Sequence, residues 1–84
     1  MNDTEFELLD ELYFMKTFEE LEAIFGKTSF HLEQELWNLI SKNWVKTLDS
    51  SDIEIGVTKE EFSDQKYNLR FNATKQGLIA HNQV

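Results

Sequence analysis

Two histidines and several pairs of adjacent acids are the side chains in this sequence with the chemistry for acid–base catalysis or metal binding. His31 and His81 lie far apart in the chain, and cysteine is absent, so neither a zinc site nor a thiol nucleophile is expected. Adjacent acids such as Glu60 and Glu61 face different directions on a helix. Three glycines form no phosphate-binding loop. The sequence therefore predicts no catalytic residue, no metal site and no cofactor.

Negative charge dominates the chain and is concentrated at its start. The formal net charge is −8, and residues 1–25 hold eight acids against Lys16 alone. Such a field repels phosphate backbones, so general affinity for nucleic acids should be poor. Two interpretations of the acidic face remain: a solvated surface, in part explained by helix starts, or an imitation of DNA that blocks a nucleic-acid enzyme.

Length and composition predict one packed domain over residues 1–84. Hydrophobic residues make up 40% of the chain and aromatic residues 13%, which is typical of a globular domain rather than a disordered tail. No apolar run reaches the roughly 18 residues needed to cross a bilayer, and the acidic start is unlike a signal peptide. We therefore expect a cytoplasmic protein without membrane contact, and no small-molecule site is evident.

Capping residues and apolar spacing predict three helices, over residues 4–15, 17–25 and 28–43. The pairs Thr4 with Glu7 and Thr17 with Glu20 both fit the S/T-x-x-E capping box. In the third helix, Thr28 or Ser29 is the expected cap. Apolar residues of that helix recur with the helical period, which predicts a buried stripe made of Leu32, Leu36, Leu39 and Ile40.

Residues 44–72 are predicted to form a hairpin, followed by a helix over 74–81. Strand character appears in residues 44–48 and again in 67–72, where apolar and polar side chains alternate. Between them, residues 49–52 indicate a turn, 53–57 a short strand or ordered loop, and 58–66 a polar, mobile stretch. The expected core comprises Leu9, Leu12, Leu21, Ile24, Leu32, Leu36, Leu39, Ile40, Val45, Leu69 and Leu78.

This order of elements resembles the winged-helix superfamily, in the form shared by many small bacterial regulators. The run Leu36–Val45 resembles a recognition helix passing into the first wing strand, with Asn43 in place of the frequent glycine. Residues Tyr67–Gly77 resemble the second wing strand and its closing Leu-Thr-x-x-Gly, with Ala73 in place of leucine. The resemblance implies an α+β fold: a three-helix bundle, a small antiparallel β-hairpin wing and a short C-terminal helix.

The same resemblance implies that the third helix enters a DNA major groove and that residues 46–66 lie near the backbone. Against this, the groove face lacks arginine, Glu33 and Glu35 would approach phosphates, and the wing has six acids against three lysines. The implied base-facing residues are Thr28, His31, Gln34, Asn38 and Ser41, and the implied phosphate contacts are Lys27, Lys42, Lys46 and Lys66.

Two aromatic residues of the third helix, Phe30 and Trp37, fall outside its apolar stripe. Exposed aromatic side chains concentrate binding energy at protein interfaces, so both are candidates for contact with a partner. The alternative is internal packing, with Phe30 on the preceding turn and Trp37 on the second helix or a sheet edge. We expect a non-enzymatic regulatory or adaptor module that binds a protein partner or a second copy of itself. The rival hypothesis is a sequence-specific DNA-binding regulator.

Overall fold

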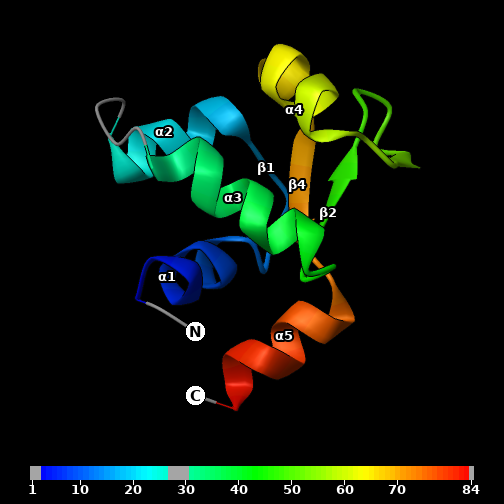
Figure 1. Cartoon of the computed structure of the whole chain (residues 1–84). Helices are drawn as coiled ribbons and strands as arrows, with labels where there is room; N and C mark the ends of the chain where they lie inside the picture. Colours follow the sequence, from blue (N-terminus) through cyan, green and yellow to red (C-terminus); the bar gives the residue numbers. More distant parts are fainter. Residues whose placement is uncertain (1–2, 27–30, 84) are drawn as a thin grey trace.

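The computed structural model describes residues 3–26 and 31–83, and over these residues the fold is α+β (Figure 1). Five α-helices and a four-stranded antiparallel sheet form one core. The elements, in chain order, are α1 (Asp3–Glu11), β1 (Lys16–Thr17), α2 (Phe18–Phe25), α3 (His31–Ser41), β2 (Val45–Leu48), β3 (Glu54–Ile55), α4 (Lys59–Gln65), a 3₁₀ helix η1 (Lys66–Asn68), β4 (Arg70–Ala73) and α5 (Lys75–Asn82).

Local signals in the sequence account for several helix ends. Thr17 caps α2 by a capping box: the Glu20 amide donates to Thr17 Oγ1 at 3.1 Å, and the Thr17 amide donates to Glu20 Oε1 at 3.0 Å. Gly26, with φ of 91°, ends α2. Asn43 has φ of 63° and turns the chain from α3 into β2, as its tolerance of the left-handed conformation predicts.

The first helix is shorter than predicted, because a long-range contact ends it. It stops at Glu11 rather than residue 15, and Thr4 lies inside it rather than at its cap. In a continuing helix the Leu12 carbonyl would accept the amide of residue 16. Instead it accepts the Ala73 amide and the Asn72 side-chain amide, both at 2.9 Å. Residues 16–17 are thereby freed to form β1, a strand that the sequence analysis missed.

The hairpin predicted between residues 44 and 72 forms the centre of the sheet. β2 pairs with β4 in the register Val45↔Ala73 to Leu48↔Arg70. β1 adds to the outer side of β4 and β3 to the outer side of β2, which gives the order β1-β4-β2-β3. Helices α1, α2 and α3 lie together beside this sheet, and α4 and α5 lie at its opposite ends (Figure 1).

Residues 58–66 are not the mobile stretch that their polarity predicted. They contain α4, which begins at a third capping box: the Glu61 amide donates to Thr58 Oγ1 at 3.2 Å, and the Thr58 amide to Glu61 Oε1 at 2.9 Å. Phe62 of α4 is 1% exposed and fixes the helix to the core. Periodicity could not indicate this helix, since it contributes a single apolar side chain to the core.

The motif Thr74-x-x-Gly77 joins α5 to the residues just before β2. Thr74 Oγ1 accepts the Gly77 amide at 3.0 Å and donates to the Asn43 carbonyl at 2.7 Å. The Thr74 amide donates to the Trp44 carbonyl at 2.9 Å. A Cβ on Gly77 would overlap that same carbonyl oxygen, so glycine is needed for the close approach of the α5 backbone to Trp44.

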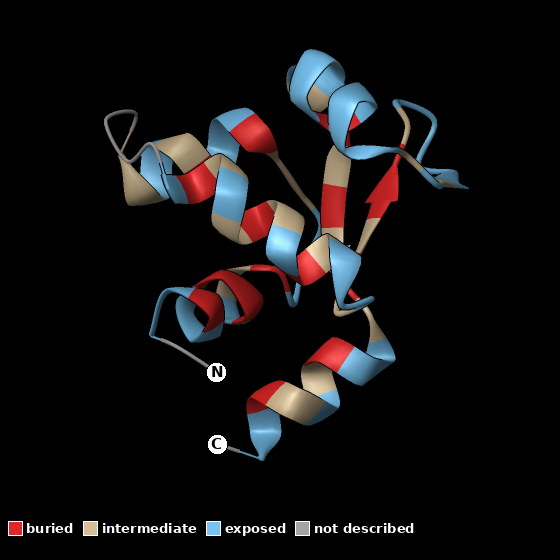
Figure 2. Ribbon diagram, in the orientation of Figure 1, coloured by how far each residue is buried: buried red, intermediate tan, exposed pale blue. Residues whose placement is uncertain are grey.

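The core lies between the helices and the sheet (Figure 2). Most of the predicted core residues are buried, whereas Ile40 and Leu78 are only partly buried and Ile24 is 47% exposed, which contradicts its predicted place in the core. The buried apolar residues are Leu8, Leu9, Leu12, Phe18, Leu21, Leu32, Leu36, Leu39, Val45, Leu48, Phe62, Leu69, Phe71 and Ala73. Among the described residues, no helix has the length and apolar character needed to cross a bilayer.

Candidate interaction face on α3 and α4

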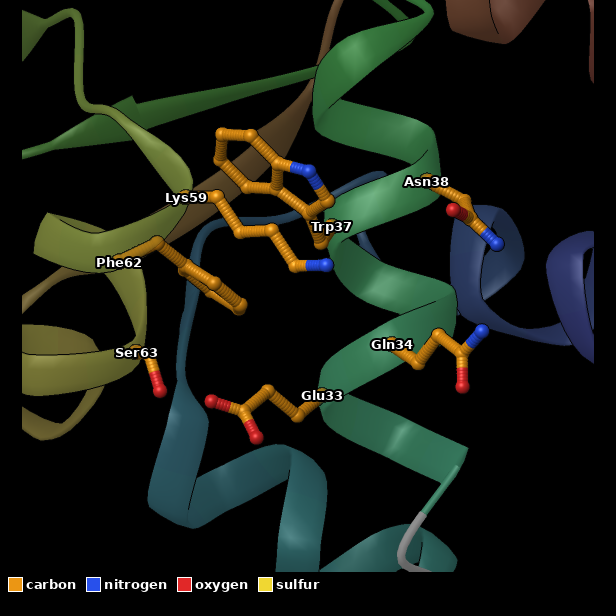
Figure 3. Close-up of a pocket in the computed structure, with 7 residues that line it drawn as sticks. All are labelled: Glu33, Gln34, Trp37, Asn38, Lys59, Phe62 and Ser63. Carbon is orange, nitrogen blue, oxygen red and sulfur yellow. The ribbon is translucent and has the colours of Figure 1, made fainter.

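A groove of about 290 Å³ lies between α3 and α4, and we call it the α3–α4 groove (Figure 3). It has an aromatic floor and a polar rim. Helix α3 lines it with Glu33, Gln34, Trp37 and Asn38, and α4 lines it with Lys59, Phe62 and Ser63.

The floor is a stack of Trp37 on Phe62, with ring centroids 5.5 Å apart and an interplanar angle of 29°. Phe62 in turn meets Phe18 and Phe71 edge to face, at centroid distances of 6.5 and 5.9 Å. Trp37 is half-buried. It packs against the core and stacks on Phe62 of α4, a contact that neither interpretation named. Its remaining exposed surface faces the groove.

Hydrogen-bond donors and acceptors, among them one lysine and one glutamate, surround this floor. Lys59 extends across the groove beside Trp37, and Glu33 and Ser63 face each other at the far end (Figure 3). Glu33 Oε1 also accepts from Lys66 Nζ at 3.2 Å. Gln34 and Asn38 form the outer lip, and their amide groups point away from α4 (Figure 3). The rim thus offers donors and acceptors without a net excess of positive charge.

The polar face of α3 is on the surface, as the helical phase predicts. His31, Gln34, Asn38 and Ser41 are all exposed. The Ser41 hydroxyl is used locally, because it donates to the Trp37 carbonyl at 2.8 Å and the Asn38 carbonyl at 3.1 Å. Gln34 and Asn38, one helical turn apart, are the pair of amides best placed to contact a partner. The candidates Lys27, Thr28 and Phe30 lie outside the described residues.

Two of the lysines implied as phosphate contacts are held by carboxylates. Lys42 Nζ lies 2.6 Å from Glu5 Oε2 and 4.8 Å from the centre of the Trp44 ring. The Glu5 side chain is 7% exposed, so Lys42 neutralises a carboxylate that burial would otherwise destabilise. Lys66 is paired with Glu33 as described. Lys46, on β2, is half-buried and pairs with no carboxylate among residues 3–26 and 31–83.

Two described titratable groups have altered pKa values, and in each case a hydrogen bond is the main cause. The Thr17 backbone amide, donating to the Glu20 carboxylate in the α2 capping box, lowers the pKa of Glu20. The hydrogen bond from the Tyr67 hydroxyl to Glu22 Oε2, at 2.9 Å, raises the pKa of Tyr67. Both groups therefore form hydrogen bonds that hold parts of the fold together. Within the described part of the chain, no three histidine, aspartate or glutamate side chains are grouped so that they could hold a metal ion.

The sequence analysis predicted the α3 side of this face but not the α4 side. The polar side of α3 follows from its 3.6-residue period, but α4 and Phe62 were assigned to a mobile segment. The signal that could have found α4 is Thr58-x-x-Glu61, the same capping box recognised at Thr17. Comparison of the chain with protein-family models, with curated proteins and with solved structures found no match, so its own geometry is the basis for interpreting the face.

Proposed function

We propose that this protein is a non-enzymatic winged-helix module that binds another protein through α3 and α4. The winged-helix part of the proposal is supported by the order of elements. Three helices precede the antiparallel pair β2 and β4, β1 joins that sheet beside β4, and α5 follows through Thr74-x-x-Gly77. The three helices, the antiparallel pair and the final helix follow the order that the sequence resemblance implies, whereas β1 is an addition that it did not imply.

The observation that favours a protein partner over DNA is that two lysines implied as phosphate contacts are already paired with carboxylates. Lys42 and Lys66 each lie against a carboxylate, at 2.6 and 3.2 Å. A phosphate would have to compete with those carboxylates for the two lysines, and it would approach two negative charges. Because phosphate contacts provide most of the non-specific affinity for DNA, an acidic face of this kind is poorly suited to it.

The segment between β2 and β4 supports the same conclusion. A wing that contacts DNA lies near the backbone beside the recognition helix. Here the segment contains α4, which folds back onto α3 through the stack of Phe62 on Trp37. The resulting groove has an apolar floor that suits an apolar side chain of a partner, and the Gln34 and Asn38 amides on the outer side of α3 are placed to hydrogen-bond to the partner beyond it.

A pull-down with matched variants tests this function. The tagged protein is used to capture partners from extracts of its source, and the Gln34→Ala/Asn38→Ala variant is compared with Gln76→Ala/Gln83→Ala, a control in and just after α5. All four residues are exposed, so both variants should fold. We expect a captured protein, identified by mass spectrometry, that the first variant loses and the second retains. Equal capture by both variants would contradict the proposal.

Sequence-specific DNA binding is the second candidate, and the exposure of Gln34 and Asn38 one turn apart on α3 favours it. A titration of DNA fragments at two salt concentrations distinguishes it. Each phosphate contact should steepen the log–log salt dependence by about 0.9. Tight, salt-sensitive binding to one sequence, weakened by Gln34→Ala/Asn38→Ala, would replace the protein-contact proposal. Absence of binding at about 50 mM salt would exclude DNA as the partner.

A further inference from the structure

A second groove, of about 260 Å³, lies between α1 and α2 and has no part in the proposed function. We call it the α1–α2 groove. Its apolar lining is Phe6 from α1 with Ile24 and Phe25 from the end of α2, and its acidic lining is Glu7, Asp10 and Glu11 from α1.

The apolar part of this groove is exposed yet held in place. Phe6 is 36% exposed and Ile24 47% exposed. Phe25 packs partly against the core, and the Phe6 ring stacks on His81 of α5 at a centroid distance of 4.2 Å. Neighbouring exposed apolar side chains on a rigid support are a feature of contact surfaces rather than of a solvated face.

The acids beside it occupy positions where negative charge destabilises α1. Asp10 and Glu11 lie in the last turn of the helix, where the helix dipole disfavours negative charge and no basic residue offsets it. Glu7 and Glu11 are four residues apart, a spacing at which like charges destabilise a helix. Asp10 Oδ1 lies 3.5 Å from His81 Nε2, whereas no described lysine or arginine pairs with Glu7 or Glu11. Helix stability therefore does not explain these acids.

We propose that the α1–α2 groove binds a basic amphipathic helical segment of a partner protein. An apolar residue of that segment would cover Phe6 and Ile24, and its lysines or arginines would pair with Glu7 and Glu11. A second copy of this chain is a poor occupant, because each copy has a net charge of −8. The chain's own basic part, residues 67–84, contains β4 and α5, which are already packed in the fold.

The test uses the full chain and a fluorescently labelled peptide of about 18 residues, with leucines on one helical face and lysines on the other. Binding is followed by fluorescence anisotropy. We expect saturable binding that Glu7→Gln/Glu11→Gln weakens by about tenfold, and Ile24→Ser by about as much. The control Glu54→Gln/Asp64→Asn removes the same charge from exposed positions elsewhere and should change the dissociation constant by less than about twofold.

Three further readouts separate a specific groove from a general effect. A peptide of the same composition scrambled to lack an apolar face should bind about tenfold more weakly. Glu7→Gln/Glu11→Gln should unfold at or above the wild-type temperature, since it relieves a like-charge pair. Gln34→Ala/Asn38→Ala should bind the peptide as the wild type does, so this proposal and the proposed function fail independently. Absence of saturable binding, equal binding of the scrambled peptide, or equal losses in both charge variants would overturn the proposal.

Discussion

The two grooves of this domain differ in how their acids are neutralised. Beside the α3–α4 groove, Glu33 is paired with Lys66, and Lys59 extends across the opening. Beside the α1–α2 groove, Glu7 and Glu11 face no lysine or arginine of residues 3–26 and 31–83. The acid of the first groove is therefore paired within the fold, whereas Glu7 and Glu11 of the second are not paired with a described cation, which is the observation on which the proposed basic partner rests.

The aromatic residues of the two grooves differ in the same way. Phe62 is 1% exposed and lies among Trp37, Phe18 and Phe71, so it belongs to the core as much as to the groove. Phe6 is 36% exposed, and among residues 3–26 and 31–83 its ring stacks on that of His81. Phe62 of the α3–α4 groove therefore contributes to the stability of the core, whereas Phe6 of the α1–α2 groove lies partly at the surface.

The largest expected effect tests that contrast. Phe62→Ala should lower the free energy of unfolding by about 3–5 kcal/mol, because it removes the side chain that docks α4 and leaves a cavity beside Phe71. Phe6→Ala should cost less than about 1 kcal/mol, as does the loss of a partly exposed side chain with few neighbours. Urea unfolding followed by Trp fluorescence measures both. Similar costs for the two variants would contradict the distinction drawn between the grooves.

A second prediction concerns a carboxylate that is paired within the fold. Lys42→Ala should destabilise the protein by about 1 kcal/mol, because it removes a cation that lies 2.6 Å from the Glu5 carboxylate, which is 7% exposed. Lys46→Ala is the matched control and should change stability by less than about 0.5 kcal/mol. Thermal unfolding at low and high salt measures the difference. If the two lysine variants are equally stable, Glu5 does not depend on Lys42.

The Glu5–Lys42 pair also shows which contacts could not be predicted from the sequence. The helical periods of α2 and α3 and the alternation in β4 follow from nearest neighbours in the chain, and those elements were predicted. Glu5 and Lys42 are distant in the sequence, and nothing in either neighbourhood indicates that they meet. Lys42 was therefore named among the phosphate contacts that the resemblance implies.

Two errors in the predicted fold have the same origin, because both elements depend on contacts between residues distant in the sequence. The end of α1 depends on the Leu12 carbonyl accepting hydrogen bonds from Asn72 and Ala73, which are brought to it only by the sheet. The docking of α4 depends on Phe62 meeting Trp37 across the groove. Local propensity could not predict either contact, although the capping box at Thr58 could have indicated the start of α4.

That capping box gives a third prediction, of intermediate size. Thr58→Ala should cost about 1 kcal/mol, because it removes the hydroxyl that accepts the Glu61 amide at the start of α4. Thr58→Ser keeps a capping hydroxyl and should restore most of the loss. Hydrogen exchange of residues 59–65 locates the effect at α4. Unchanged exchange there would mean that Phe62 alone holds the helix in place.

The smallest expected effect concerns stability at low pH, and it contrasts Glu20, a carboxylate that caps a helix, with the carboxylates of the α1–α2 groove. The pKa of Glu20 is lowered below 4.5 by the Thr17 backbone amide. A group with a lowered pKa stabilises the folded state above its unfolded pKa, and this stabilisation is lost as pH falls through the folded value. Glu20→Gln keeps a side chain that fits the capping box, so it should unfold near the wild-type temperature at neutral pH and lose less stability below about pH 4.5. Glu19→Gln removes the same charge from the neighbouring exposed position and serves as the control for net charge. Thermal unfolding from pH 7 to pH 3 measures all three proteins, and parallel curves for wild type and Glu20→Gln would show that the capping carboxylate contributes nothing to acid sensitivity.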